Sequence, residues 1–210
     1  MTVSDDASSS SAAAFARDLG RHLRDGRVTA ALAAVPRELF VPEALRDRAW
    51  RNEALPIGGG QTISQPLLVA GMCEVLGLRG DEHVLDVGTG SGWHAALLSR
   101  LAAHVWSIER RPELSAAAAR ALATAGIENV TLLVGDGGRG HPVAGPYDAI
   151  NVAAAAPRGA LATLETQLAA GGRLLAPVGG SDGQRLELVR RTPEGLERVT
   201  GPAVRFVPLI

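Results

Sequence analysis

A short glycine-rich turn has the residue types and spacing of a ligand-binding loop. In VLDVGTGSGWHAALLS (84–99) an apolar run leads into the pattern G-x-G-x-G and then into residues with helical spacing. Glycines at the end of a strand let the backbone approach a ligand where a Cβ atom would collide. A dinucleotide site needs a third small residue at position 93, and Trp93 is too large. Asp86, just before the turn, instead favours a ligand that carries positive charge.

Two more acids follow the next apolar runs. Glu109 lies 23 positions beyond Asp86, and Asp136 stands between Gly135 and Gly137. A carboxylate at Glu109 can accept hydrogen bonds from two ribose hydroxyls, and Asp136 can accept one from the exocyclic amine of adenine. Together the three acids fit S-adenosylmethionine, which joins an adenosine to a sulfonium and an ammonium. For any one acid alone, a helix N-cap or a turn is an alternative.

The stretch GGGQTISQP (58–66) places three glycines beside small polar side chains. By composition it is either a connector or part of a site. Because the strand-end acids follow it in the chain, we expect it to fold over the ligand as a lid, with the glycines giving hinge and close approach. Pro66 predicts the first residue of a helix that runs to about Leu78. Ser64 is then either a hydrogen-bond donor within the site or the N-cap of that helix.

The elements that must position these residues follow from the apolar pattern. Residues 12–34 predict two helices around Asp25-Gly26. From residue 83 short apolar runs alternate with helical segments, which indicates a parallel sheet covered on both faces. After residue 180 two runs without an intervening helix predict an antiparallel edge. The predicted strands are 83–87, 104–108, 130–134, 147–152, 173–178, 186–191 and 203–210, and the predicted helices of this part are 91–103, 112–125 and 158–169.

The predicted fold class is therefore α/β: a doubly wound, mostly parallel, Rossmann-like sheet with N-terminal helices and a C-terminal antiparallel edge. Residues 1–10 predict a flexible N-terminus, and residues 11–210 a single domain. Within it we expect an N-terminal helical and lid region at 11–80, a cofactor-binding core at 81–180 and edge strands at 181–210.

Composition excludes several classes of function. A net charge of −1 favours neither nucleic acid nor an anionic membrane. All 21 basic residues are Arg, so no Lys can form a Schiff base. One Cys, Cys73, and five His show no metal-ligand spacing, so no metal is expected. With no signal peptide and no apolar run of about 18 residues, we expect a cytoplasmic protein, and its size and charge predict a monomer.

These segments resemble the protein-L-isoaspartate O-methyltransferases, which are class I S-adenosylmethionine-dependent methyltransferases. The glycine turn alone would indicate only the class, whereas QTISQP and AAAAP are typical of the family. The resemblance runs from about Val35 to Leu209. It rests on VPRELFVPE (35–43), ALPIGGGQTISQP (54–66), VLDVGTGSGWHAA (84–96), SIER (107–110), GDGGRG (135–140), YDAINVAAAAP (147–157), GGRLLAPVG (171–179) and RFVPL (205–209).

The resemblance implies a reaction. A methyl group passes from S-adenosylmethionine to the free α-carboxylate of an L-isoaspartyl residue in a damaged protein or peptide, leaving S-adenosyl-L-homocysteine. The ester then forms a succinimide that can reopen as aspartate. By this resemblance Ser64 is the catalytic residue, and Thr62, Ser64, Ala154 and Pro157 are substrate-binding candidates. The implied cofactor-binding residues are Ile63, Gln65, Asp86, Gly88, Thr89, Gly90, Ser91, Gly92, Glu109, Asp136 and Gly137.

The residue chemistry suits such a transfer. A carboxylate is already ionised at neutral pH, so no general base is needed. A donor that orients it is needed, and Ser64 can supply one, with Thr62 and Gln65 as second candidates. AAAAP offers only methyls and backbone, which suits a substrate held through main-chain contacts. His94, in the first turn after the glycines, can line the pocket, and the bulk of Trp93 could reshape it.

Two other functions stay open at this point. The client could be an ordinary aspartate of one dedicated biosynthetic peptide rather than damaged protein. Alternatively, the chain could be a cofactor-binding interaction module without catalysis, although the set of Asp86, Glu109, Asp136 and Ser64 weighs against this.

Overall fold

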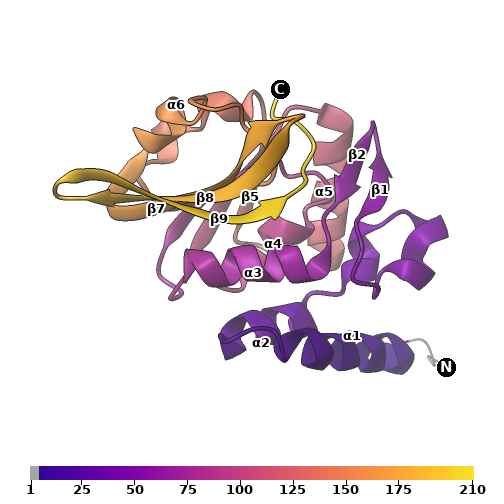
Figure 1. Ribbon diagram of the computed structural model, residues 1–210. Helices are drawn as coiled ribbons and strands as arrows, with labels where there is room; N and C mark the ends of the chain where they lie inside the picture. Colours follow the sequence, from indigo (N-terminus) through magenta and orange to yellow (C-terminus); the bar gives the residue numbers. More distant parts are fainter. Residues whose placement is uncertain (1–4) are drawn as a thin grey trace.

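A computed structural model describes residues 5–210 of the protein, with side chains described from residue 13 onward. Its centre is a seven-stranded sheet of order β5-β4-β3-β6-β7-β8-β9. Figure 1 shows the neighbouring strands β7, β8 and β9 of this sheet. Strands β3 to β7 pair in parallel, and β8 and β9 extend the sheet antiparallel. The bounds are β3 His83–Val87, β4 His104–Glu109, β5 Val130–Val134, β6 Tyr147–Val152, β7 Leu168–Gly180, β8 Gly183–Thr192 and β9 Gly195–Val204.

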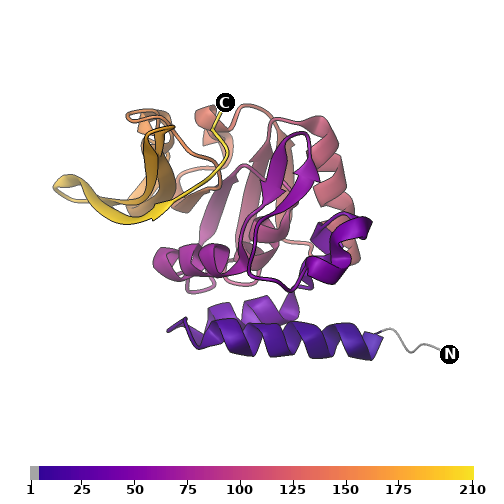
Figure 2. The ribbon, with the colours of Figure 1, turned by 45° about the vertical axis from the view of Figure 1, so that its right-hand side comes forward.

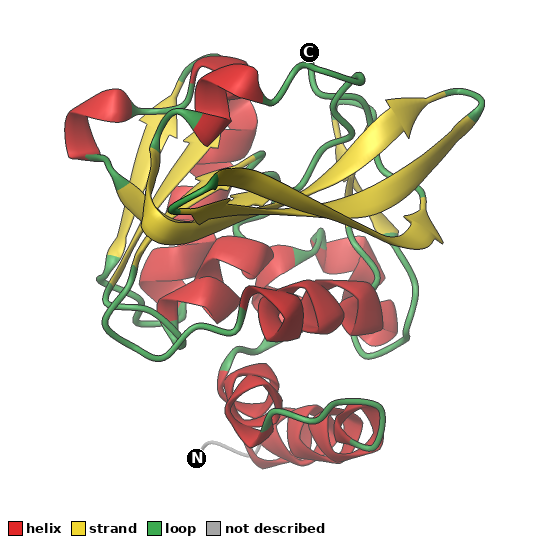
Figure 3. Ribbon diagram, turned by 60° about the vertical axis from the view of Figure 1, so that its left-hand side comes forward, coloured by secondary structure: helices red, strands yellow, loops and turns green. Residues whose placement is uncertain are grey.

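Helices cover both faces of this sheet, as Figure 3 shows. One face packs Val84 and Val105 with the helices α2, α3, α4 and α5. The other packs Leu85 and Ile150 around the short helix α6. The predicted doubly wound α/β fold is therefore confirmed. The helices are α1 Asp5–Gly20, α2 Gly26–Ala34, α3 Pro66–Leu76, α4 Trp93–Ser99, α5 Pro112–Thr124 and α6 Ala162–Glu165, and the 3₁₀ turns are Arg37–Phe40, Glu43–Arg48, Gly137–Arg139 and Pro142–Ala144.

The first two helices form a pair below the rest of the chain (Figures 1 and 2). Asp25 caps α2, because its Oδ1 accepts a hydrogen bond from Arg27 N at 2.8 Å. Residues 1–4 of the predicted flexible N-terminus lie outside the described residues, and α1 already begins at Asp5. The predicted flexibility and domain subdivision stay predictions.

Two predicted elements are wrong. The helix expected at 158–169 is a single turn, because Gly159 has φ 82° and β7 already pairs Leu168 with Tyr147. The last strand is β9 at 195–204, not 203–210. β9 is mostly exposed and lacks an apolar run, so the apolar pattern of the sequence did not predict it. The apolar tail instead crosses the carboxyl end of the sheet, where Pro208 forms a bridge with Ala155. Helix α4 is also shorter than the predicted 91–103.

Candidate active site

The GGG segment is the turn of a two-stranded hairpin, β1 (Leu55–Gly58) and β2 (Gln61–Ile63). All three glycines have positive φ, at 93°, 58° and 73°, which residues with a Cβ rarely adopt. A Cβ at Gly58 or Gly60 would meet nothing within 4 Å, and one at Gly59 would lie 3.3 Å from Nη1 of Arg111. Their positive φ values are therefore sufficient to require glycine at Gly58 and Gly60.

Ser64 connects this hairpin to α3. The N-cap of α3 is Gln65, no side chain caps the helix, and Pro66 is its first residue as predicted. The alternative of Ser64 as a helix cap is therefore wrong. Ser64 lines a small cavity against the glycine turn and also an open groove formed with the C-terminal residues.

A buried arginine, Arg37, donates a hydrogen bond to the backbone of Ser64. Its Nη2 donates to the carbonyl oxygens of Glu53 at 3.0 Å and Ser64 at 3.1 Å, and its Nη1 to that of Ala49 at 2.6 Å. The guanidinium carbon lies 5.2 Å from the ring centroid of Trp93. Burial lowers the pKa of Arg37 to about 10, with Glu53 opposing the shift, so the group stays charged at neutral pH. Arg37 thus fixes the Ser64 backbone over the helix that follows the glycine turn.

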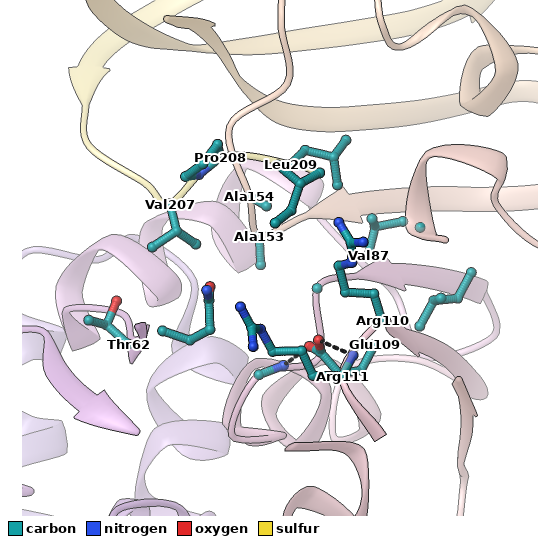
Figure 4. A pocket seen from close by; sticks show the side chains of 16 residues that line it. Thr62, Val87, Glu109, Arg110, Arg111, Ala153, Ala154, Val207, Pro208 and Leu209 are labelled. Atoms are coloured by element: carbon teal, nitrogen blue, oxygen red, sulfur yellow. Dashed lines mark hydrogen bonds between the residues drawn. The ribbon is translucent and has the colours of Figure 1, made fainter. Parts of the chain in front are cut away.

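A cavity, called the main cavity below, lies at the carboxyl ends of β3, β4 and β6. In the sheet, β4 pairs with one side of β3 and β6 with the other, so the strand order changes direction at this point. Figure 4 shows Glu109 on one side of it and Val207, Pro208 and Leu209 on the other. The Glu109 side chain is buried, with Oε2 accepting from Gly90 N at 2.9 Å and Oε1 from Arg111 N at 3.0 Å. Carboxylate oxygens accept more than one hydrogen bond each, so Glu109 keeps capacity for a ligand.

Asp86 lies behind the glycine turn rather than in the cavity. The parallel register places Ser107 of β4 and Asn151 of β6 beside it on one face. All three are fully buried; Ser107 Oγ donates to Asp86 Oδ2 at 2.7 Å and Asn151 Nδ2 to Oδ1 at 2.7 Å. Thr89 Oγ1 lies 2.6 Å from Ser107 Oγ, which ties the turn to this row. Sequence reasoning missed Ser107 and Asn151, although each is a polar residue within an apolar strand.

Asp136 is a turn residue. Its Oδ1 accepts from Gly138 N at 2.9 Å, and its Oδ2 lies 3.4 Å from Nε of Arg139. The Asp136 side chain is about half exposed. The neighbouring Gly137 does line the main cavity, and a Cβ there would fall 2.5 Å from Cγ1 of Val87. The local N-cap alternative for Asp136 is thus present in the structure.

The AAAAP segment is largely occupied by the protein's own backbone. Ala155 N donates to Val207 O at 2.8 Å, and Ala155 O accepts from Leu209 N at 2.8 Å. Ala156 pairs in the same way with Pro177 and Gly179 of β7. The expectation that this segment holds substrate by main-chain contacts therefore fails at Ala155 and Ala156. Its physical role is to fasten the C-terminal tail over the main cavity.

The structure brings most predicted site residues together. Asp86, Gly92 and Asp136 line neither the main nor the small cavity, while Gln65 and Pro157 each line an open groove beside the tail. The residues that line one or both cavities are Thr62, Ile63, Ser64, Gly88, Thr89, Gly90, Ser91, Glu109, Gly137 and Ala154.

Cys73 is buried, and burial raises the pKa of its thiol, as a core position requires. Among the side chains of residues 13–210, no group of three or more His, Cys, Asp or Glu is arranged to hold a metal ion. No helix of the described part of the chain is long and apolar enough to cross a membrane.

The fold and site define a class I methyltransferase: a mostly parallel sheet whose strand β3 leads into a G-x-G-x-G turn, with a buried acid ending the next strand. Residues 14–210 match the family described as protein-L-isoaspartate(D-aspartate) O-methyltransferase. The chain belongs to this family, and it is an enzyme, an O-methyltransferase.

Individual relatives agree with this assignment. The chain is 51% identical over 193 residues to protein-L-isoaspartate O-methyltransferase 1 of Rhodopseudomonas palustris, covering 90% of this chain and 78% of that relative. A solved protein-L-isoaspartate O-methyltransferase superposes with a TM-score of 0.85 at 29% identity, over 93% of this chain and 64% of the other. A structure from Plasmodium falciparum, described as this type of enzyme in complex with S-adenosyl-L-homocysteine, shares the fold with a TM-score of 0.83 at 21% identity, over 95% and 98% of the two chains.

Proposed function

We propose that this protein methylates the free α-carboxylate of L-isoaspartyl residues in damaged proteins and peptides, with S-adenosylmethionine as donor, and so initiates their repair through a succinimide. One observation carries the proposal. The segment that contains Ser64 and the glycine turn line the same small cavity, which shares Thr62, Gly88 and Gly90 with the main cavity beside Glu109.

The residues fit an adenosyl cofactor. Gly88 and Gly90 have φ of 93° and 53°, and both line the two cavities. At these positions the turn therefore presents backbone without Cβ atoms to a ligand. Glu109 offers a carboxylate at the wall of the main cavity, where ribose hydroxyls can donate to it. Gly137 and the apolar tail residues 207–209 complete walls that suit an adenine ring. When bound, the cofactor supplies an electrophilic methyl group on a sulfonium.

The chain's own part in the reaction is orientation and exclusion of water. The acceptor carboxylate is already ionised, so no residue has to remove a proton. Ser64 Oγ can donate to one carboxylate oxygen and leave the other free for in-line attack. Attack cancels a negative and a positive charge, so a site covered by the β1–β2 hairpin and the tail favours the step.

The acceptor peptide would enter through the open groove that Ser64 and Gln65 form with residues 202–207. Ala154 lies at the main cavity, and Pro157 lies in the groove on the other side of the tail. We propose Thr62 and Ser64 as the contacts nearest the reacting carboxylate, and Ala154 and Pro157 as contacts further along the peptide.

The decisive experiment compares an isoaspartyl peptide with its aspartyl twin. Purified protein, S-adenosylmethionine with a labelled methyl group, and each peptide in turn are incubated, and methyl ester is counted. A strong preference for the isoaspartyl peptide is expected. If neither peptide is methylated while S-adenosyl-L-homocysteine still binds, the repair assignment fails, and a dedicated peptide client takes its place.

We also propose that the enzyme works as a monomer, which light scattering coupled to size-exclusion chromatography tests directly. The cytoplasmic location expected from the sequence stays a prediction.

A further inference from the structure

A buried histidine at the small cavity has one ring nitrogen that nothing in the protein uses. His94, in the first turn of α4, is 7% exposed and lines the cavity of about 30 Å³ between the glycine turn and Ser64. Its Nδ1 lies 3.2 Å from Asn151 Nδ2. Its Nε2 is buried and has no hydrogen-bond partner among the described residues. A buried polar atom without a hydrogen-bond partner lowers the stability of the folded protein, so we expect this nitrogen to bond a ligand.

The hydrogen-bond row behind the turn fixes where the ring proton sits. The Asp86 carboxylate accepts from Asn151, so the amide nitrogen of Asn151, and not its oxygen, must face this side. The same nitrogen faces Nδ1 of His94, which must therefore be an acceptor. Burial lowers the pKa of His94, with Asp86 partly opposing the shift, so the ring is neutral at pH 7. The single ring proton is then on Nε2.

A fixed N–H donor selects the kind of group that can occupy the cavity. An ammonium carries only donors and cannot satisfy Nε2–H, whereas a carboxylate can accept from it. The hydroxyls of Thr62, Ser64 and Ser91 on the cavity wall can donate as well, whereas the Thr89 hydroxyl already donates to Ser107 Oγ, whose own proton goes to Asp86. Trp93 Nε1 is a second buried donor without a partner among the described residues. Of the residues that the structure describes, no acidic side chain lines the cavity to repel an anion.

We propose that His94 Nε2–H binds a carboxylate group in this small cavity and that Asp86, through Asn151, sets the tautomer that makes it a donor. The proposal rests on the proposed function, whose two reactants each bring one carboxylate: the amino-acid end of the cofactor and the methyl acceptor. His94 is thereby a binding residue for one of the reactants, and Asp86 and Asn151 are positioning residues.

The test measures binding with and without the carboxylate. Calorimetry is run with S-adenosyl-L-homocysteine and with its decarboxylated analogue, which keeps the amine, on the wild type, His94→Phe and His94→Gln. His104→Phe is the matched control, because His104 starts β4 at the opposite end of the sheet and bonds Thr131 there. The KM for the isoaspartyl peptide is measured on the same proteins. Thermal unfolding shows that each is folded, and His94→Ala replaces His94→Phe if that variant does not fold.

If the cofactor supplies the carboxylate, His94→Phe binds S-adenosyl-L-homocysteine about 10- to 100-fold more weakly, yet binds the decarboxylated analogue as the wild type does. If the acceptor supplies it, cofactor binding is unchanged and the KM for the peptide rises by a similar factor. In either case His94→Gln, which keeps an amide donor, recovers most of the loss, and His104→Phe shows none.

Equal loss for both cofactor analogues would mean that His94 only supports the fold, and no loss in any arm would mean that the cavity holds water; either result overturns the proposal. The outcome is separable from the proposed function, because a wild type that methylates the isoaspartyl peptide can still fail this test. A wild type that neither binds S-adenosyl-L-homocysteine nor methylates the peptide fails the proposed function instead.

Discussion

The two ends of the central sheet both carry buried polar side chains, but they use them differently. At the amino end, Glu82 accepts from Arg79 N and Gly80 N and pairs with Nη2 of Arg173 at 3.0 Å. Arg173 in turn donates to the carbonyls of Leu76 and Gly77, where α3 ends. At the carboxyl end, His94 Nε2 and Trp93 Nε1 are buried without a partner in the described chain.

This difference separates a structural cluster from a binding cluster. A structural cluster satisfies its donors and acceptors within the chain, because an unpaired buried group costs stability. A binding cluster leaves groups for the ligand and accepts that cost in the free protein. The following variants should therefore change stability at one end of the sheet and ligand handling at the other.

The largest effect is expected from Arg173→Met at the amino end. It leaves the buried Glu82 carboxylate without its cation, and we expect the free energy of unfolding to fall by about 3 kcal/mol. Urea unfolding measures the loss, and kcat of the folded fraction should not change. The control is Arg190→Met, the exposed residue of β8 that pairs with Arg173 of β7, with an expected change below about 0.5 kcal/mol. A loss of kcat without a loss of stability would undo the distinction between the two ends.

Ser64→Ala should produce the next largest effect. Removing the donor that orients the acceptor carboxylate should lower kcat on the order of 100-fold, whereas cofactor affinity and stability should change little. Initial rates with the isoaspartyl peptide and calorimetry with S-adenosyl-L-homocysteine separate the two quantities. Ser115→Ala in α5, a buried serine outside the cavities, is the control. Wild-type kcat in Ser64→Ala would remove Ser64 from the mechanism.

Glu109→Gln should weaken cofactor binding by about 10-fold, because an amide offers one acceptor oxygen in place of a charged pair. Calorimetry with S-adenosyl-L-homocysteine measures this, and Glu128→Gln, exposed before β5, is the control. The turn would also lose part of the bond from Gly90 N, so a thermal scan accompanies the measurement. Unchanged affinity would place the ribose elsewhere.

The smallest effect is expected from acidification. Burial lowers the pKa of His94 below its ordinary value of 6.5, so the unfolded chain binds a proton before the folded chain does. The stability that neutral His94 contributes is present above pH 6.5 and is lost as pH falls through the folded pKa. The pKa of His104 is lowered too, by burial and then by His83, and adds to the same slope. Melting temperatures from pH 7.5 to 5 should therefore fall less steeply in His94→Gln than in the wild type.

Much of the fold could be predicted because its signals are local. The strands 83–87, 130–134 and 147–152 were expected with the observed bounds, since each is an apolar run between polar residues. Proline gave the start of α3 in the same local way. The failures at 158–169 and 195–210 have one cause. Whether an apolar residue packs in a helix, a strand or a covering tail depends on what lies opposite, which spacing along the chain does not record.

The candidate site also has residues that local signals predict and residues that only distant neighbours determine. The glycine turn and Glu109 follow directly from strand ends, because the end of a parallel strand in a covered sheet fixes the edge on which its last residue lies. The role of Asp86 could not be predicted, since it depends on Ser107 and Asn151, which are 21 and 65 positions away. Strand register brings these three residues into one row, and register is a property of the assembled sheet.

The sequence by itself thus determined the class of ligand and the edge of the sheet that binds it, through glycines, acids and prolines whose effects are local. Only the tertiary structure decided that Arg37 bonds the Ser64 backbone, that the C-terminal tail lines the main cavity, and that Asn151 lies between Asp86 and His94. The physical reason is that hydrogen-bond direction and burial are set by neighbours far apart in the chain, and folding alone brings those neighbours together.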